Sequence, residues 1–429
     1  MLMFRENAAG AAGHASTRGE RVLAPLVLVV SLFFMWGVAN NLNDILIRQF
    51  KKAFSLSDLQ SGFVQSAFYL GYFFFAVPAG VFMRRLGYKS TVILGLVAYA
   101  CGAFLFYPAA AAQKYELFLL ALFVIASGLA FLETSANPLM TILGPQAGAE
   151  RRLNFAQAFN SLGAISGILI GRFFILSGRE HTAEELAAMS ETARAAYYAS
   201  EASAVQKPYL VIGVIVALWA MLVLMTRFPR LVEHEQASTY PGKRVPNLYR
   251  KRQLVLAVIA QFFYVGAQVG VWSYLIRYAQ AAVPDMPEKT AADYLTISLV
   301  LFMIGRFGGA ALMQRWSASL MLAACGAANA ALMAVASLLP GWPGLWALIA
   351  SSFFMSIMFP TIFALGIRGL GEHTKVASSL LVMAIIGGAV LTAVMGALSD
   401  ASAIHVAMLV PFVCFLVVFG FALFAHRGE

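Results

Sequence analysis

The chain has 429 residues, of which 61% are hydrophobic and 12% are charged, and its formal net charge is +10. A soluble domain has about 25% charged residues, so this composition carries more apolar surface than a soluble fold could bury. Long apolar runs recur along the whole sequence, each about the length that crosses ~30 Å of hydrocarbon as a helix. The chain is therefore predicted to be a polytopic membrane protein.

Twelve membrane-spanning helices are predicted. Helices are favoured over strands because the runs lack the alternation, over roughly ten residues, that is typical of a membrane β-barrel. The segment before the first span has no apolar stretch or cleavage site of its own, so that span is expected to be an uncleaved anchor. In chain order the predicted spans are 23–47, 59–83, 89–111, 116–143, 153–177, 208–227, 253–278, 291–313, 318–339, 343–367, 374–399 and 402–424.

The fold class predicted from these spans is an all-α membrane protein with two six-helix bundles. The longest polar connection on the cytoplasmic side follows the sixth span, and its prolines and glycine suit a linker. The predicted organisation is a cytoplasmic tail over 1–22, a first bundle over 23–227, a cytoplasmic linker over 228–252, a second bundle over 253–424 and a cytoplasmic tail over 425–429.

The two halves also resemble each other in sequence. The matching positions are 79–90 with 309–320, Gly163 and Gly171 with Gly388 and Gly396, and Pro138 with Pro360. Parallel repeats of six spans are typical of two bundles that rock around a shared site near the midplane of the membrane.

Lysines and arginines predict the orientation, because cytoplasmic loops carry an excess of them. With both termini in the cytoplasm, the basic linker falls on that side, with Arg230, Lys243, Arg244, Arg250, Lys251 and Arg252. The positive charge is therefore interpreted as a topology signal and as attraction to lipid headgroups, and no nucleic acid is expected as a partner. The three cysteines lie within spans without ligand spacing, so neither a disulfide nor a metal site is expected.

The outer connection between spans five and six has a helix-forming composition. It is rich in glutamate, at Glu180, Glu184, Glu185, Glu191 and Glu201. A charge run of this kind predicts a solvated surface helix.

Two acidic residues are predicted to lie at depth, Asp44 in span one and Glu133 in span four. Even the lowest estimates put a charge at the bilayer centre at ~2.5–3.5 kcal/mol, so such residues usually face a cavity and serve transport. The alternative for each is a structural ion pair or a satisfied buried acid. The six histidines fall in tails, connections or span ends, so the two acids are the candidate proton carriers.

The expected depths of the two acids differ. Glu133 lies about 25 Å along span four at ~1.5 Å per residue, beyond the midplane, and Asp44 is expected nearer the outside. Asn137 and Pro138 follow Glu133, and the proline predicts a looser helix at that point.

Amides and aromatic rings share helix faces with these acids. The predicted faces hold Trp36, Asn40, Asn43 and Asp44 in span one; Gln65, Tyr69 and Tyr72 in span two; Glu133 and Asn137 in span four; Gln157, Asn160 and Ser161 in span five; and Gln261, Tyr264, Gln268 and Trp272 in span seven. Amides offer paired donors and acceptors to neighbouring hydroxyls, and rings cover the C–H face of a sugar. The pattern favours a neutral polyhydroxylated ligand. The alternative is that the amides join helix to helix, as Gly163, Gly167 and Gly171 are expected to do by packing.

Several segments resemble one transporter family. These are "FFMWGVANNLNDILIRQF", "QSAFYLGYFFFAVPAG", "LETSANP", "NFAQAFNSLGAI", "QFFYVGAQVGVWSYLIRYA" and "FMSIMFPTIFALGI". They are similar to the L-fucose–proton symporters of the major facilitator superfamily, and the resemblance runs from Leu23 to the C-terminus.

The resemblance implies a twelve-helix transporter of the bacterial inner membrane that imports L-fucose with a proton by alternating access. It implies that Asp44 and Glu133 are the essential carboxylates and that Trp36, Asn41, Gln157 and Asn160 occupy binding positions. Protons would be the coupling ion with no other cofactor, the partners would be sugar, proton and membrane lipid, and a monomer is expected.

One comparison within the superfamily, one departure and several alternatives accompany the resemblance. Related glucose/galactose permeases have a non-acidic residue in place of Glu133, which tilts the prediction towards fucose without excluding another hexose. The loop after span two has Arg84 where the wider superfamily has an acid, so its gating ion pair is expected to differ.

A proton-driven drug exporter would need a Gly-Pro-rich motif in span five, and a membrane-embedded enzyme would need a metal set or a nucleophile–base pair at depth. A sugar receptor without transport is the remaining alternative.

Overall fold

The computed structural model describes residues 25–42, 58–143, 147–175, 188–228 and 251–427, with residues 46, 49, 50, 53, 54, 56, 145 and 185 between them. Every regular element within this part of the chain is a helix. Eleven of these helices are long and apolar enough to cross a membrane. The chain is therefore an all-helical membrane protein, as the sequence predicts.

The first half contains the N-terminal helix Pro25–Leu42 and five labelled α-helices. These are α2 (Asp58–Ala112), α3 (Tyr115–Ile142), α4 (Ala149–Ile170, continued as a π-helix over Gly171–Ile175), α6 (Glu191–Ser203) and α7 (Gln206–Met225).

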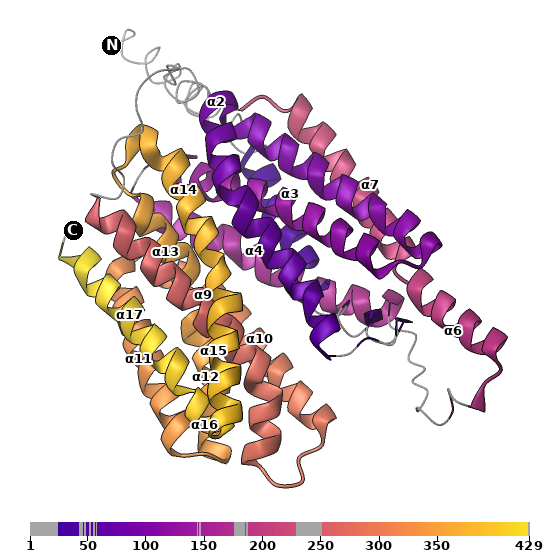
Figure 1. The fold of residues 1–429 in the computed structure, drawn as a ribbon. Coiled ribbons are helices and arrows are strands. Elements are labelled where there is room, and N and C mark those ends of the chain that lie inside the picture. The colour runs from indigo at the N-terminus through magenta and orange to yellow at the C-terminus, as the bar shows by residue number, and fades with distance from the viewer. Residues whose placement is uncertain are drawn as a thin grey trace, which may run out of the picture.

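The second half begins with α9. Its elements are α9 (Arg252–Ala282), α10 (Glu288–Leu312), α11 (Ala318–Leu338), α12 (Trp342–Met355), α13 (Met358–Ile367), α14 (Thr374–Met383), α15 (Gly387–Ala401), α16 (Ile404–Ala407) and α17 (Leu409–His426), with 3-10 turns at Gly371–His373 and Ala384–Ile386. Figure 1 shows the helices up to α7 gathered in one group and those from α9 onward in another.

Helix α2 accounts for two predicted spans. The apolar stretch Phe63–Ala112 has 50 residues, about 75 Å at ~1.5 Å per residue, which is enough for two crossings. Its helix is interrupted at Gly87, where φ is 81° and ψ is 176°. Glycine adopts this positive φ because it has no Cβ. The chain therefore reverses at Gly87, and with α2 divided there the described residues hold the twelve spans that the sequence predicts.

Two glycines bring the first helix against α4. A Cβ added to Gly163 would lie 2.1 Å from the carbonyl oxygen of Phe34, and one added to Gly37 would lie 2.1 Å from that of Asn160. Only glycine permits backbones to approach so closely. The contact places Trp36 and the asparagines that follow it beside the amides of α4.

Proline has different effects in α3 and in the α12–α13 helix pair. Helix α12 ends at Met355 and α13 begins at Met358, two residues before Pro360. Since Pro360 has no N–H, the Ser356 carbonyl loses its helical donor. In contrast, α3 continues through Pro138 to Ile142. Every residue of α3 from Ile125 to Met140 is buried. The loosening expected after Glu133 stays a prediction.

Helix α6 lies within the predicted solvated connection between spans five and six. Ser190 caps it by accepting from the Ala193 N–H, and its first turns are exposed. Glu201 in its last turn is 3% exposed and accepts a 2.8 Å hydrogen bond from Gln49 Nε2. The expectation of a fully solvated helix is therefore wrong at this turn, because the glutamate docks against the end of the first span.

Candidate functional site

A cavity of about 260 Å³ lies between the two halves, close to the first helix, α2, α3 and α4 on one side and α9 and α10 on the other. Ligand sites typically have ~300–1,000 Å³, so this volume suits a small ligand. Its lining is Trp36, Asn40, Asn41, Gln65, Phe68, Tyr69, Tyr72, Glu133, Gln157, Asn160, Ser161, Ala164, Ile165, Val265, Gln268, Val269, Trp272, Ser273, Leu299, Phe302, Arg306, Phe359 and Ile385.

The wall from the first half is rich in amides. It brings together six predicted amides and acids from four helices, together with Trp36 and Tyr69. The six are Asn40, Asn41, Gln65, Glu133, Gln157 and Asn160. Asn160 Nδ2 donates to the Phe33 carbonyl at 3.2 Å, which fixes its amide against the first helix. Paired amide donors and acceptors of this kind match the hydroxyls of a neutral ligand.

Glu133 is the carboxylate at the cavity, and its side chain is 4% exposed. Tyr72 donates its hydroxyl to Glu133 Oε1 at 3.2 Å. No described residue hydrogen-bonds Oε2. One oxygen of this acid is therefore held by the protein, and the other is buried with its hydrogen-bonding capacity unused by the described residues.

Arg306 is a buried cation at the same cavity, and the sequence shows it within span eight without predicting its role. It is 4% exposed, its Nη1 donates to Gln157 Oε1 at 2.9 Å, and its Nε donates to the Ser356 carbonyl at 3.0 Å. That carbonyl is the one that Pro360 leaves without a helical donor. Arg306 and Glu133 also attract each other electrostatically. The signal that could have found the residue is its position, since a charged residue inside a span usually serves function.

The wall from the second half is more apolar. Beside Gln268 and Trp272, which the sequence predicts, it contains valines, Leu299, Phe302, Phe359 and Ile385. The rings of Trp272 and Phe302 meet edge to face with centroids 4.9 Å apart, and Arg306 Cζ lies 4.6 Å from the Phe302 centroid. A ligand with hydroxyls on one side and C–H groups on the other fits these two walls.

Three predicted binding residues do not line the cavity in this structure. Asn137 is fully buried and accepts from Gln157 Nε2 at 3.1 Å, which makes it a support for a lining residue. Tyr264 is fully buried and donates to the Met355 carbonyl at 2.9 Å. Gln261 is also fully buried and lies one turn before Tyr264 on α9. Asp44, the second predicted carboxylate, lies outside the described residues.

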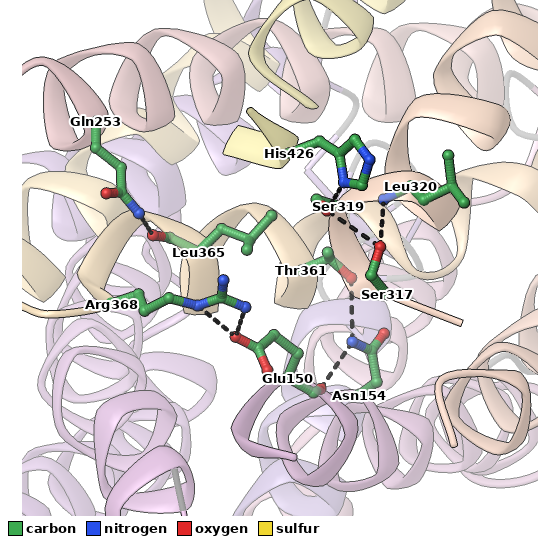
Figure 2. Close-up of polar contacts among 10 residues, drawn as sticks. All are labelled: Glu150, Asn154, Gln253, Ser317, Ser319, Leu320, Thr361, Leu365, Arg368 and His426. Atoms are coloured by element: carbon green, nitrogen blue, oxygen red, sulfur yellow. Dashed lines mark hydrogen bonds and ion pairs between the residues drawn. The ribbon is translucent and has the colours of Figure 1, made fainter. Parts of the chain in front are cut away.

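The halves are joined by polar contacts at the end of the molecule where α4 begins and α13 ends, which we call the Glu150 end (Figure 2). Arg368, just after α13, donates to Glu150 Oε1 through Nη2 at 2.6 Å and Nε at 3.1 Å. One turn further along α4, Asn154 Nδ2 donates to Thr361 Oγ1 at 3.1 Å. These contacts hold α4 of the first half against α13 and Arg368 of the second half at this end.

Helices α2 and α14 meet at the same end. Lys375, which is 4% exposed, places its Nζ 5.3 Å from the centroid of the Tyr88 ring. Tyr88 follows Gly87, where α2 is interrupted, and Arg84 lies one turn before it. A cation–aromatic contact between the halves thus lies at this interruption of α2.

The fold and the cavity between two halves define a membrane transporter, and comparison with known proteins gives the family. The model of the Major Facilitator Superfamily matches residues 26–384, and the chain belongs to that family.

Individual relatives cover nearly the whole chain. The L-fucose-proton symporter of Escherichia coli (strain K12) is 48% identical over 410 residues, which are 94% of each chain. The glucose/galactose transporter of Brucella abortus biovar 1 is 38% identical over 404 residues, again 94% of each. The crystal structure of FucP, a Major Facilitator Superfamily transporter in the outward conformation, matches with a TM-score of 0.86 at 47% identity, covering 94% of this chain and 99% of that one.

Proposed function

We propose that the chain is a proton-coupled symporter that imports L-fucose, or a closely related hexose or pentose, by alternating access. The observation that carries the proposal is the buried Glu133 carboxylate at a cavity with amides on one wall and apolar groups on the other. The similarity to the L-fucose-proton symporter of Escherichia coli supports the choice of sugar.

Glu133 has the surroundings that proton coupling needs. One carboxylate oxygen has a tyrosine donor and the other has no described partner. A carboxyl group at such a place can bind a proton when sugar is present and release it when the cavity opens to the other side. Asp44 is proposed as the second proton site, nearer the outside, and protons are the coupling ion with no other cofactor.

The sugar is proposed to contact both walls. The amides of Asn41, Gln65, Gln157 and Asn160 would bind hydroxyls, while Trp36 and Trp272 would cover C–H surface. Gln268 and Tyr69 complete this set. Asn137, Gln261 and Tyr264 act behind the lining in this state, and their contact with sugar requires a change of conformation.

Alternating access gives the Glu150 end its role. We assign it to the cytoplasm, with both termini on that side, because the basic linker 228–252 connects helices there. The contacts Glu150–Arg368 and Asn154–Thr361 then close the cytoplasmic path while the cavity receives sugar from outside. The bacterial inner membrane is the proposed location, with lipid as surroundings, a monomer as the unit and the two bundles 23–227 and 253–424 as the moving bodies.

A second candidate function is transport of glucose or galactose. The 38% identity to the Brucella abortus glucose/galactose transporter favours it, and epimers differ only in the direction of a hydroxyl. The presence of Glu133 favours the proton-coupled fucose assignment.

Uptake into proteoliposomes tests the proposal. Purified protein would be supplied with labelled L-fucose, D-arabinose, L-galactose, D-glucose and D-galactose, with and without an inward proton gradient. We expect L-fucose to accumulate with the gradient and the accumulation to collapse with a protonophore. Equal initial rates and equal final levels under both conditions would contradict symport and leave a facilitator, and preferred uptake of D-glucose would select the second candidate.

A further inference from the structure

Two buried serine hydroxyls hold Trp272 from outside the cavity. Trp272 Nε1 donates to Ser352 Oγ at 3.0 Å, and Ser352 Oγ is hydrogen-bonded to Ser298 Oγ. The three residues come from α9, α12 and α10, and both serines are fully buried. Neither serine is among the residues that line the cavity.

The hydrogen bond to Ser352 decides which part of Trp272 a ligand can contact. An indole ring has a single polar group, its N–H donor. Because that donor is bonded to Ser352, Trp272 offers only ring carbon atoms to the cavity. Phe302 holds the ring from another direction, at an interplanar angle of 77°.

Ser298 is the second hydrogen-bond partner of the Ser352 hydroxyl, and either hydroxyl can be the donor of that bond. Because Ser352 Oγ accepts from the indole N–H, its own hydrogen points away from the indole, and Ser298 Oγ lies within reach to accept it. Ser298 therefore supports the contact, whereas Ser352 makes it.

We propose that Ser352, supported by Ser298, is a positioning residue for the ligand site. By holding the indole N–H, it fixes Trp272 as an apolar surface for the C–H face of the sugar. This inference rests on the proposed function, since it takes the ligand to be a sugar. It assigns a role in ligand affinity to a residue that does not contact the ligand.

The test compares two substitutions of nearly equal shape. Ser352→Thr keeps a hydroxyl and Ser352→Val lacks it, so any effect of the added volume is common to both. We expect Ser352→Val to weaken L-fucose binding about fivefold relative to Ser352→Thr, the effect of losing one typical hydrogen bond. Ser352→Ala, which adds no volume, should weaken binding similarly. The half-saturating sugar concentration for uptake should rise while the maximal rate is retained.

A second background separates positioning from packing. Trp272→Phe keeps an aromatic ring and removes the N–H, so Ser352→Thr and Ser352→Val should bind L-fucose equally in that background. The control is Ser351→Ala, since Ser351 is equally buried in α12 but donates only to the Leu348 carbonyl of its own helix. This variant should bind like the unsubstituted protein.

The outcomes separate the inference from the proposed function. Equal affinities of Ser352→Thr and Ser352→Val in the native background would overturn the inference alone, as would a difference that persists with Trp272→Phe. If the unsubstituted protein bound none of the five sugars, the proposed function would fail and the inference with it.

Discussion

Gln157 of α4 and Arg306 of α10 meet across the boundary between the halves, with Arg306 Nη1 donating to Gln157 Oε1 at 2.9 Å. Gln157 Nε2 in turn donates to Asn137 on α3. One amide of the cavity thus links a buried cation of the second half to two helices of the first. Sugar affinity and contact between the halves are expected to depend on the same residue.

Substitution of Gln157 should therefore affect both stability and sugar binding. Gln157→Ala removes an acceptor from a buried guanidinium, and a hydrogen bond to a charged group contributes ~1.5–3 kcal/mol. We expect a lower melting temperature in detergent together with weaker L-fucose binding by calorimetry. Asn160→Ala serves as the comparison, because Asn160 lines the same cavity without an Arg306 bond. Asn160→Ala should weaken L-fucose binding but lower the melting temperature less than Gln157→Ala does. Equal decreases of the melting temperature in the two variants would contradict the stabilising role assigned to the Gln157–Arg306 hydrogen bond.

The Glu150–Arg368 pair should set how often the Glu150 end opens. The two side chains are 11% and 33% exposed, so the pair is screened and its loss is expected to shift the equilibrium by about 1 kcal/mol. In Glu150→Gln, spin labels at positions 151 and 316, which lie near each other at this end, should report more long distances by pulsed dipolar spectroscopy.

A charge exchange and a control sharpen this experiment. Glu150→Arg combined with Arg368→Glu should restore the short distances. Arg315→Gln changes another exposed arginine at the same end of the second half and should leave the distances as they were. An unchanged distribution in Glu150→Gln would show that this ion pair does not control closure.

The Tyr88–Lys375 contact is expected to contribute to the same closure. A cation over an aromatic face is worth ~0.5–1 kcal/mol at exposed sites and about 2 when desolvated, and Lys375 is buried. Tyr88→Leu should increase the open population in the same spin-label assay, whereas Tyr88→Phe keeps the ring and should behave like the unsubstituted protein. Identical effects of both variants would assign the role to the hydroxyl rather than to the ring.

Sequence patterns predicted the helices better than the contacts between them. The lengths of the apolar runs suffice to predict twelve spans, because hydrocarbon thickness fixes helix length. Periodicity also placed Gln261, Tyr264, Gln268 and Trp272 on one stripe of α9. Only Gln268 and Trp272 line the cavity. Nearer the start of α9 the same stripe faces α13, where the ring of Tyr264 lies beside that of Phe359. Helical periodicity predicts the direction in which a side chain points, but it does not predict which neighbouring helix covers that side chain at a given position along the helix.

Two further residues show the same limit. Arg306 is visible in the sequence as a charge inside a span. One of its acceptors is the Ser356 carbonyl, which lacks a helical donor because Pro360 has no N–H. Glu201 belongs to a run of glutamates that is mostly exposed, and its burial depends on Gln49, 152 positions earlier in the chain. Neither partnership follows from local sequence. The roles of Asp44 and of the predicted binding residues stay predictions.

The last prediction concerns Glu133 and the difference between an amide and no side chain. Glu133→Gln keeps an oxygen that can accept from Tyr72, and its amide N–H can donate where the protonated carboxyl would. It therefore mimics the protonated form permanently. We expect it to bind L-fucose and to exchange it across the membrane, with no dependence on pH, and to lose accumulation driven by a proton gradient.

Glu133→Ala removes the hydrogen-bonding group as well as the charge, so it should lose sugar binding together with accumulation. Tyr72 would also lose its acceptor, at a cost of ~1–3 kcal/mol for a buried donor without a partner. The control is Glu116→Gln, an exposed glutamate in the first turn of the same helix, which should accumulate sugar normally. The measurements are calorimetric binding, counterflow and gradient-driven uptake on the same preparations. Accumulation by Glu133→Gln in a proton-dependent manner would make Glu133 a structural acid, and Asp44 would then be the remaining candidate carrier.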